Sequence, residues 1–174
     1  MVYSPSLRYL DVGCGDALFV WGGNVPENVV CLDLDVFRHT TVNADALHLP
    51  FRKIFDYAFL LEILEHMDDV ESAIKEAFRV ANSVVISYPD EDVETFLKSQ
   101  AGLGRRDMTD IVRKHLEFLR QHGLVEFVDD PKVHAHTKDK ERIKRDVEVI
   151  TELCGKSILL SDGMYRGWGW ICEG

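Results

Sequence analysis

The sequence has no excess of positive charge: 20 Lys and Arg residues stand against 30 Asp and Glu residues, giving a formal net charge of −10 at pH 7. A protein whose main ligand is nucleic acid needs a basic surface for the phosphate backbone. The sequence also has no apolar run of membrane-spanning length and no N-terminal basic segment followed by an apolar run. We therefore expect a cytoplasmic protein without a membrane anchor, and we do not expect nucleic acid as its main partner.

Cysteine is scarce and is not spaced for a metal. No C-x-x-C pair occurs, and the four cysteines lie in or beside apolar runs, at Cys14, Cys31, Cys154 and Cys172. These positions favour reduced core cysteines of a cytosolic protein. His134 and His136 share one face of an extended segment, but no third ligand follows at a plausible spacing. No metal site is predicted.

Repeats and low-complexity segments are also absent, and 46% of the 174 residues are apolar, which is enough for one large core. Strand-like and helix-like segments alternate up to residue 89, and this alternation predicts a parallel sheet with helices on both faces. The expected strands are residues 8–12, 28–33, 41–43, 55–61, 83–87, 157–160 and 167–172, and residues 124–128 are a further short candidate. The expected helices are residues 17–21, 36–39, 69–80, 92–98, 107–121 and 138–153, and Asp68 or Asp69 is expected to cap the third of them.

The last two strands are expected to pair with each other in an antiparallel arrangement at the sheet edge. The predicted fold class is therefore α/β, a Rossmann-like doubly wound sheet that is mostly parallel and has a C-terminal antiparallel hairpin. We expect residues 1–174 to form a single domain.

The chain is organised around a short glycine turn. The strand at residues 8–12 leads into Gly13 and Gly15, and Asp16 is placed to cap a helix that begins at Ala17. A side chain at either glycine would block the approach of a ligand to the backbone, and a positive φ is cheap only for glycine. The N–H groups at this turn favour a ligand that carries negative charge.

A carboxylate ends the second expected strand. Asp33 follows Gly15 by 18 residues, close to the ~20 residues that separate these two features in nucleotide-binding units. Because ligands lie beyond the carboxyl ends of the strands in such sheets, Asp33 is a candidate acceptor for ribose hydroxyls. A nicotinamide dinucleotide is disfavoured, because Leu18 stands where its fingerprint needs a small residue.

Six short motifs follow one another in order along the chain. They are Tyr9–Gly15, Val29–Asp33, Asp45–Phe51, Phe55–Tyr57, Leu64–His66 and Glu76–Val80. Together they resemble the motifs of the class I methyltransferases that use S-adenosylmethionine, in the branch that acts mainly on small molecules. The resemblance is continuous from Tyr9 to about Tyr88 and weaker beyond.

The resemblance implies a role for each residue of a cofactor site. Asp11 would lie near the cofactor's ammonium group, Asp33 would accept from the ribose hydroxyls, and Asp45 would accept from the exocyclic amine of adenine. The full set of implied cofactor-binding residues is Asp11, Gly13, Cys14, Gly15, Asp33, Leu34, Asp45, Ala46, Leu60 and Leu61, with Leu34 on the adenine and the two later leucines on the opposite wall.

Three residues near the ends of the fourth and fifth strands are candidates for acceptor chemistry. Glu62, His66 and Tyr88 are expected to face the pocket, where each could orient an acceptor or take its proton. The alternative is that Glu65 and His66 only brace the helix that follows, and Tyr88 carries the same ambiguity.

The sequence departs from the family in two places. Ala17 replaces a third glycine, and we expect it to take ordinary helical dihedral angles. The helices that usually precede the first strand are missing, so we expect residues 91–134 to supply the lid and the acceptor pocket. A protein partner or a second copy of the chain is the other candidate for this cover.

These observations predict an enzyme that transfers a methyl group from S-adenosylmethionine to a small or medium-sized acceptor molecule. The first alternative is a non-catalytic module that binds S-adenosylmethionine, or a partner subunit of a methyltransferase complex. A nicotinamide-dependent oxidoreductase is a third possibility, which a titration with the cofactors would test.

Overall fold

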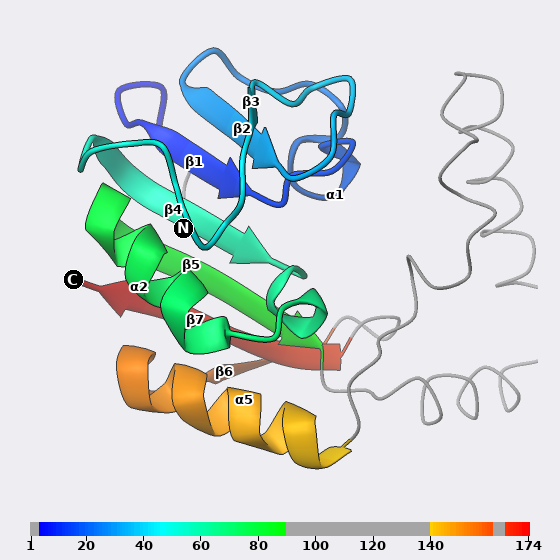
Figure 1. The fold of residues 1–174 in the computed structure, drawn as a ribbon, viewed down its shortest axis with the longest axis vertical. Coiled ribbons are helices and arrows are strands. Elements are labelled where there is room, and N and C mark those ends of the chain that lie inside the picture. The colour runs from blue at the N-terminus through cyan, green and yellow to red at the C-terminus, as the bar shows by residue number, and fades with distance from the viewer. Residues whose placement is uncertain (1–3, 90–139, 162–165) are drawn as a thin grey trace, which may run out of the picture. The chain divides into compact units, whose positions relative to one another are not determined.

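The computed structural model describes residues 4–89, 140–161 and 166–174. In this part of the chain seven strands form one sheet, in the order β3-β2-β1-β4-β5-β7-β6 (Figure 1). The strands are β1 (Tyr9–Val12), β2 (Val29–Asp33), β3 (Val42–Asn43), β4 (Phe55–Leu61), β5 (Ala81–Pro89), β6 (Ile158–Ser161) and β7 (Arg166–Glu173). The helices are α1 (Leu18–Trp21), the 3-10 helix η1 (Leu64–His66), α2 (Val70–Val80) and α5 (Lys140–Cys154).

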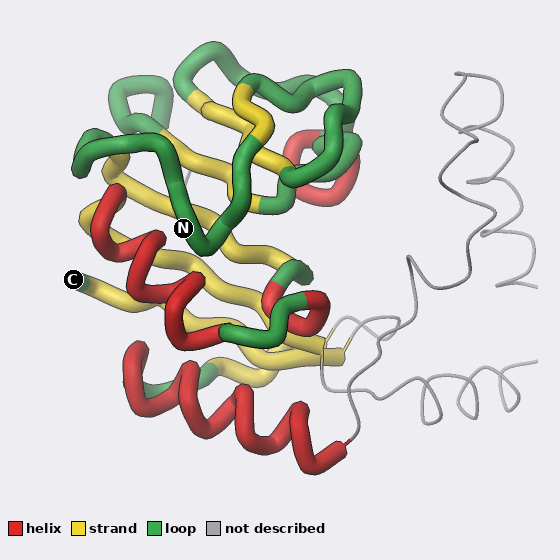
Figure 2. Tube along the Cα trace, viewed as in Figure 1, coloured by secondary structure: helices red, strands yellow, loops and turns green. Residues whose placement is uncertain are grey.

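The sheet is parallel from β3 to β5, and β7 pairs antiparallel with both β5 and β6. Figure 2 shows the strands in yellow and the helices in red. Leu10 of β1 lies between Val30 of β2 and Ala58 of β4, which makes β1 a central strand. The C-terminal hairpin joins the sheet through β7, where Trp170 lies opposite Ile86 of β5. The predicted fold class is confirmed.

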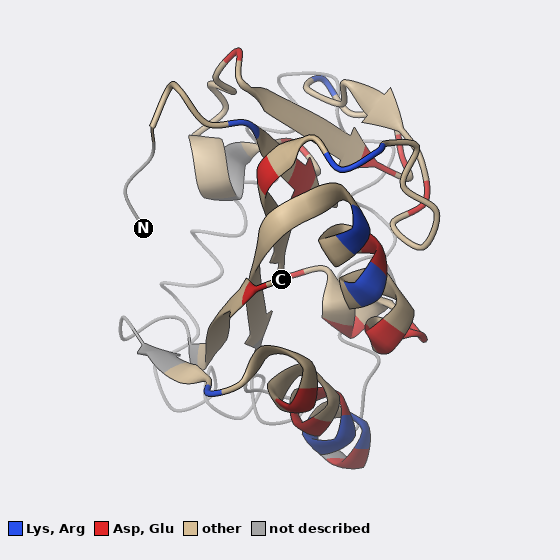
Figure 3. Ribbon diagram, turned by 90° about the vertical axis from the view of Figure 1, so that its left-hand side faces the viewer, with Lys and Arg blue, Asp and Glu red and all other residues tan. Residues whose placement is uncertain are grey.

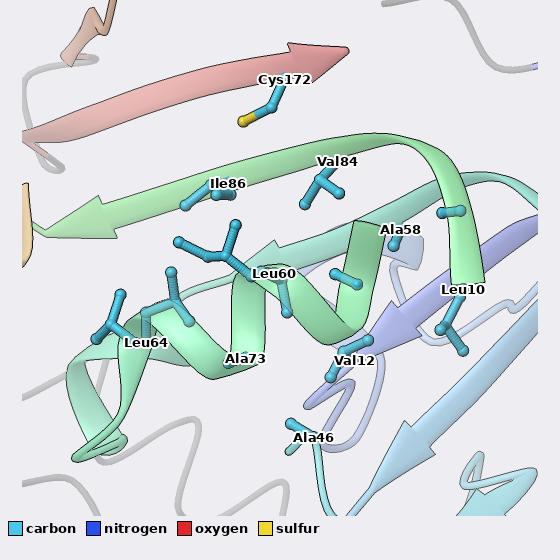
Figure 4. Packing of buried hydrophobic residues seen from close by; sticks show 14 of the residues in the cluster. Leu10, Val12, Ala46, Ala58, Leu60, Leu64, Ala73, Val84, Ile86 and Cys172 are labelled. Atoms are coloured by element: carbon cyan, nitrogen blue, oxygen red, sulfur yellow. The ribbon is translucent and has the colours of Figure 1, made fainter. Parts of the chain in front are cut away.

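One face of the sheet is covered by α2 and α5. Alternate strand residues point to this face because side chains alternate along a strand. Figure 4 shows Leu10, Val12, Leu60 and Ile86 pointing toward α2, and these side chains belong to one buried apolar cluster. α2 begins where predicted, because the Asp69 side chain accepts a hydrogen bond from the Ser72 N–H at 3.0 Å and caps the helix.

The opposite face carries a smaller, aromatic cluster beside α1. Tyr9 of β1 stacks on Phe59 of β4 with ring centroids 5.6 Å apart, and Trp21 at the end of α1 meets both rings at 6.4 and 6.0 Å. Cys31 of β2 is fully buried in the same cluster. Because Asp11 lies two residues after Tyr9, its side chain is on this face as well.

One predicted helix is wrong, and two others cannot be compared with the structure. Residues 36–39 do not form the expected helix, but a turn closed by the hydrogen bond from the Thr40 N–H to the Phe37 carbonyl at 3.2 Å. The Phe37 N–H donates to the Thr40 hydroxyl at 2.9 Å, and this bond competes with helical pairing. The helices predicted at 92–98 and 107–121 and the strand candidate at 124–128 lie outside the described residues.

The cysteine prediction is wrong for one pair. Cys154 at the end of α5 and Cys172 of β7 form a disulfide, with their Cα atoms 4.7 Å apart. These positions meet because β7 returns between β5 and β6, beside the helix that precedes β6. Cys14 and Cys31 are free thiols.

The outer side of α5 carries basic and acidic residues along its length (Figure 3). Lys144 and Glu148 are one helical turn apart, exposed, and separated by 3.9 Å between the amino group and the carboxylate. This arrangement agrees with the solvated helix face expected for a mixed-charge segment. None of the helices in the described ranges is both long enough and apolar enough to span a bilayer.

Candidate cofactor site

The strand order reverses at β1, and this reversal locates the candidate site. β2 lies on one side of β1 and β4 on the other, and all three strands run parallel. In open α/β sheets the ligand crevice lies outside the carboxyl ends of the strands at such a reversal. The glycine turn after β1, Asp33 at the end of β2 and Glu62 after β4 all occur at this edge.

The glycine turn has the backbone conformation predicted from the sequence. Gly13 has φ 72° and Gly15 has φ 52°, both in the left-handed region. At Gly13 a Cβ atom would overlap the Ile63 side chain, whereas the space around a Cβ on Gly15 is open within 4 Å. Gly13 is therefore required for packing, and Gly15 leaves room for a ligand over the backbone.

Ala17 corrects the prediction of ordinary helical dihedral angles. Its φ is 59°, so it takes the left-handed conformation that a third glycine would take, and α1 begins one residue later. The Ala17 N–H donates to the Cys14 carbonyl at 2.8 Å and closes the turn before the helix. A non-glycine residue held at positive φ costs about 1–2 kcal/mol.

Asp11 is buried at the carboxyl end of β1, with 2% of its surface exposed. The Trp21 indole N–H donates to its carboxylate at 2.7 Å. Burial raises the pKa of Asp11 to about 6, the Trp21 hydrogen bond opposes this increase, and the nearby charge of Asp33 adds to it. Asp11 therefore carries a destabilised negative charge at neutral pH, which a cationic group would relieve.

The Asp33 carboxylate is held at the turn. One of its oxygens accepts from the Gly15 N–H at 2.8 Å, and the other accepts from the Asp35 N–H at 3.0 Å. A carboxylate has about four lone-pair sites, so two remain for further donors. Leu34 and Val36, one and three residues after Asp33, are apolar side chains that are 72% and 77% exposed.

Asp45 begins the loop after β3. One carboxylate oxygen accepts from the Leu47 N–H at 2.9 Å, and the other lies 3.5 Å from the His48 ring. The neighbouring Ala46 is largely buried against the α2 side of the core. Asp45 is half exposed and follows strand β3, which pairs with β2.

Glu62 directly follows β4 and has a strained backbone conformation, with φ 55°. Its N–H donates to the Ser87 hydroxyl at 3.2 Å, and that hydroxyl donates to the Glu62 carboxylate at 2.7 Å. This reciprocal pair fixes the Glu62 side chain at the edge of the sheet. Ser87 could not be identified from the sequence, because its role depends on the pairing of Leu61 with Ser87 across the two strands.

The two leucines of β4 point to opposite faces. Leu61 packs in the aromatic cluster, on the face that carries Asp11. Leu60 is 1% exposed and packs under α2 (Figure 4), so only its backbone is left for a ligand. Strand alternation makes it impossible for both side chains to line one wall.

Tyr88 is fully buried on the α2 side of the sheet. Its hydroxyl donates to the Asp146 carboxylate of α5 at 2.9 Å, and burial together with Asp146 raises its pKa well above the ordinary value. This position suits a bridge between β5 and α5 rather than contact with an acceptor. A role in acceptor chemistry is not supported by this geometry.

His66 and Glu65 share the 3-10 helix that follows the Glu62 loop. Glu65 is buried, and its carboxylate lies 3.8 Å from the ring of the half-exposed His66. Nearby, Arg142 of α5 donates to the Met67 carbonyl at 3.0 Å and to the Asp68 carboxylate at 2.5 Å. This loop is thus tied to α5, and His66 remains accessible from solvent.

The two free cysteines lie side by side below the turn. The neighbouring Cys31 thiol, burial and the nearby carboxylates of Asp11 and Asp33 raise the pKa of the Cys14 thiol. A thiol with a raised pKa is a poor nucleophile at neutral pH. Within the described residues no group of three or more Asp, Glu, His and Cys side chains is arranged to hold a metal ion.

The comparisons with known proteins agree with this architecture. Residues 10–84 match the model of a family described as a methyltransferase domain. A SAM-dependent methyltransferase from Aquifex aeolicus has 15% identity and a TM-score of 0.53, over 95% of this chain and 82% of that chain. Magnesium protoporphyrin IX methyltransferase ChlM from Synechocystis PCC 6803, solved with bound SAH, has 14% identity and a TM-score of 0.52, over 95% and 72%.

A further match is shorter. The cyclase SpnF has 24% identity over 47% of this chain and a TM-score of 0.36, and the matched part spans 38% of that protein. No curated protein matches the chain significantly.

The resemblance seen in the sequence is thereby confirmed. Residues 10–84 match a methyltransferase domain, and the described strands and helices have the fold of the S-adenosylmethionine-dependent methyltransferases compared above, whose methyl donor is S-adenosylmethionine.

Proposed function

We propose that the protein binds S-adenosylmethionine at the carboxyl ends of β1 and β2 and transfers its methyl group to a small-molecule acceptor. The observation that carries the proposal is the juxtaposition of a buried carboxylate, an open glycine turn and a second carboxylate at the reversal of strand order. Asp11, Gly15 and Asp33 supply these three features, and Asp33 bonds the Gly15 backbone directly.

The described residues fit the two ends of this molecule. Asp11 offers a negative charge to the ammonium group, and the remaining lone pairs of Asp33 accept from the ribose hydroxyls. Leu34 offers an exposed apolar surface to the adenine ring, because burying it against an apolar partner is favourable. Asp45, with Ala46 beside it, is assigned to the exocyclic amine.

Methyl transfer from this cofactor requires few catalytic groups from the protein. The cofactor supplies a methyl group on a sulfonium, which is already an excellent leaving group. The chain has to hold the acceptor in line with that group and keep water away. Glu62 is the residue that we assign to orienting the acceptor or accepting its proton, with Ser87 holding the carboxylate in place. His66 is the second candidate for this role.

The segment that forms the lid and the acceptor pocket is assigned from the sequence alone. We assign residues 91–134 to it; they lie outside the described residues. A partner protein or a second copy of the chain is the alternative source of this cover. The cytoplasmic location also stays a prediction, and the disulfide between Cys154 and Cys172 weighs against it, because cytosolic proteins rarely keep structural disulfides.

The proposal is tested in two stages. Calorimetric titration of the chain with S-adenosylmethionine and with its demethylated product should give one site of micromolar affinity, and NAD should give no heat. Incubation with radiolabelled methyl donor and small-molecule extracts should then label an acceptor. Binding without turnover would identify a non-catalytic module, and heat with NAD alone would point to an oxidoreductase.

A further inference from the structure

Two charged residues of α2 form a paired unit on the helix surface. Glu76 and Arg79 lie three residues apart, and the guanidinium donates to both carboxylate oxygens, each at 2.8 Å. A surface ion pair of this kind contributes little to stability by itself. What distinguishes this pair is that both members also bind the backbone of a distant segment.

That segment is the loop from β3 to β4. Arg79 donates to the Phe51 carbonyl at 2.6 Å and to the Leu49 carbonyl at 2.7 Å, while the Glu76 carboxylate accepts from the Leu49 N–H at 3.0 Å. Both backbone polar groups of Leu49 are therefore held by this pair. Residues 44–54 contain no helix or strand, so these bonds satisfy backbone polar groups that would otherwise be paired within a helix or a sheet.

The fixed point at Leu49 is one turn away from Asp45. The Asp45 carbonyl accepts from the His48 N–H at 3.0 Å, and its carboxylate accepts from the Leu47 N–H at 2.9 Å. The turn from Asp45 to His48 thus runs directly into Leu49. The side chains of Ala46 and Leu49 pack in the same core cluster, so the loop is anchored from its inner side as well.

We propose that the Glu76–Arg79 pair is a positioning unit that sets the place of Asp45 and so gives the protein its preference for adenine over a base without the exocyclic amine. This inference rests on the proposed function, since it assumes that a nucleoside of the S-adenosylmethionine type occupies the site. The selectivity arises because a carboxylate held in place accepts from an amine and repels a carbonyl oxygen at the same position.

The test compares two ligands on matched variants. S-adenosylhomocysteine carries the amine, and S-inosylhomocysteine carries a carbonyl oxygen in its place. Arg79→Met removes the bonds to the loop and keeps an unbranched apolar side chain. Lys75→Met is the control on the same helix, because Lys75 pairs with Glu71 at 2.5 Å on the exposed surface.

The unaltered protein should bind S-adenosylhomocysteine roughly 10- to 100-fold more tightly than the inosine analogue, as expected for one hydrogen bond to a charged group. In R79M this ratio should fall to less than about 3-fold, while K75M should keep it. Should R79M not fold, E76Q provides the same comparison, since it removes the carboxylate that holds both Arg79 and Leu49.

Each outcome is informative. R79M could bind both ligands more weakly while the ratio of the two affinities stays unchanged. The Glu76–Arg79 pair would then only stabilise the fold, and the inference would be overturned. Equal binding of both ligands by the unaltered protein would also overturn it, while leaving the proposed function intact. Failure of the unaltered protein to bind either ligand would refute the proposed function itself.

Discussion

Replacing Asp11 by Asn should stabilise the protein, and the gain should grow with pH. Asp11 has a pKa of about 6 in the folded chain against an ordinary value of 3.8. The folded state therefore holds the proton more tightly than the unfolded state, and ionisation costs folding free energy. Asn keeps the shape and a carbonyl oxygen for the Trp21 indole N–H, but it cannot ionise.

The size of the effect follows from the two pKa values. The cost of ionising Asp11 is small below pH 4, is about 1.6 kcal/mol at pH 5 and reaches about 3 kcal/mol at pH 8. Stability is thus lost as pH rises through the interval between the two values and is constant above it. The advantage of D11N over the unaltered protein should roughly double between pH 5 and pH 8.

Urea unfolding of both proteins at pH 5, 6, 7 and 8 measures this difference directly, because other titrating groups contribute equally to both chains. A difference that stays constant across this range would refute the assigned cause, since only an ionising Asp11 makes it pH-dependent. A variant less stable than the unaltered protein at pH 8 would contradict it as well.

The same carboxylate should make cofactor binding depend on pH. Only ionised Asp11 attracts the ammonium group, and about a tenth of it is ionised at pH 5. The affinity for S-adenosylhomocysteine should therefore fall about tenfold from pH 8 to pH 5 in the unaltered protein. D11N should bind weakly at both values, without this pH dependence.

Two further substitutions separate packing from ligand contact. Gly13→Ala should lower the unfolding free energy by about 2–4 kcal/mol in urea titrations, because the new Cβ overlaps Ile63 and the residue has a positive φ. Gly15→Ala should lower the unfolding free energy by only about 1–2 kcal/mol, because its Cβ meets open space. It should nevertheless abolish cofactor binding in calorimetry. The opposite order of the two stabilities would contradict this assignment. Tyr88→Phe should lower the unfolding free energy by about 1–3 kcal/mol, because the buried Asp146 loses a donor, and should leave the cofactor Kd unchanged. A tenfold loss of turnover in this variant at unchanged stability would instead indicate that Tyr88 contacts the acceptor.

The sequence predicts the strands and the placement of Asp33 beside the glycine turn because both depend on local patterns. β4 has the predicted bounds, Phe55–Leu61, and α2 begins after Asp69, one of the two residues predicted as its cap. Asp33 stands beside the glycine turn because parallel strands bring their carboxyl ends to one edge. These features require only periodicity, spacing and one cap.

The predictions fail where a residue's role depends on the face of the sheet on which its side chain lies, or on contacts made by its turn. Tyr88 shares the face of Val84 and Ile86, so strand alternation turns it toward α5 and away from Asp11. Ala17 takes a positive φ because the turn closes on Cys14 before the helix begins.

Long-range partners account for the remaining gaps. The disulfide between Cys154 and Cys172 depends on the return of β7 beside β5, which spacing along the chain does not reveal. Ser87 is missed for the same reason, since it acts on Glu62 across two strands.

The central claim is that Asp33 and the glycine turn hold a nucleoside joined to an amino acid. Titration calorimetry of S-adenosylhomocysteine into the unaltered protein and into Asp33→Ala tests it most directly, with circular dichroism to show that both are folded. The account predicts one site of micromolar affinity in the unaltered protein and a loss of at least about 30-fold in the variant, because two ribose hydroxyls lose their acceptor. No heat from the unaltered protein, or equal affinity in the two proteins, would contradict it.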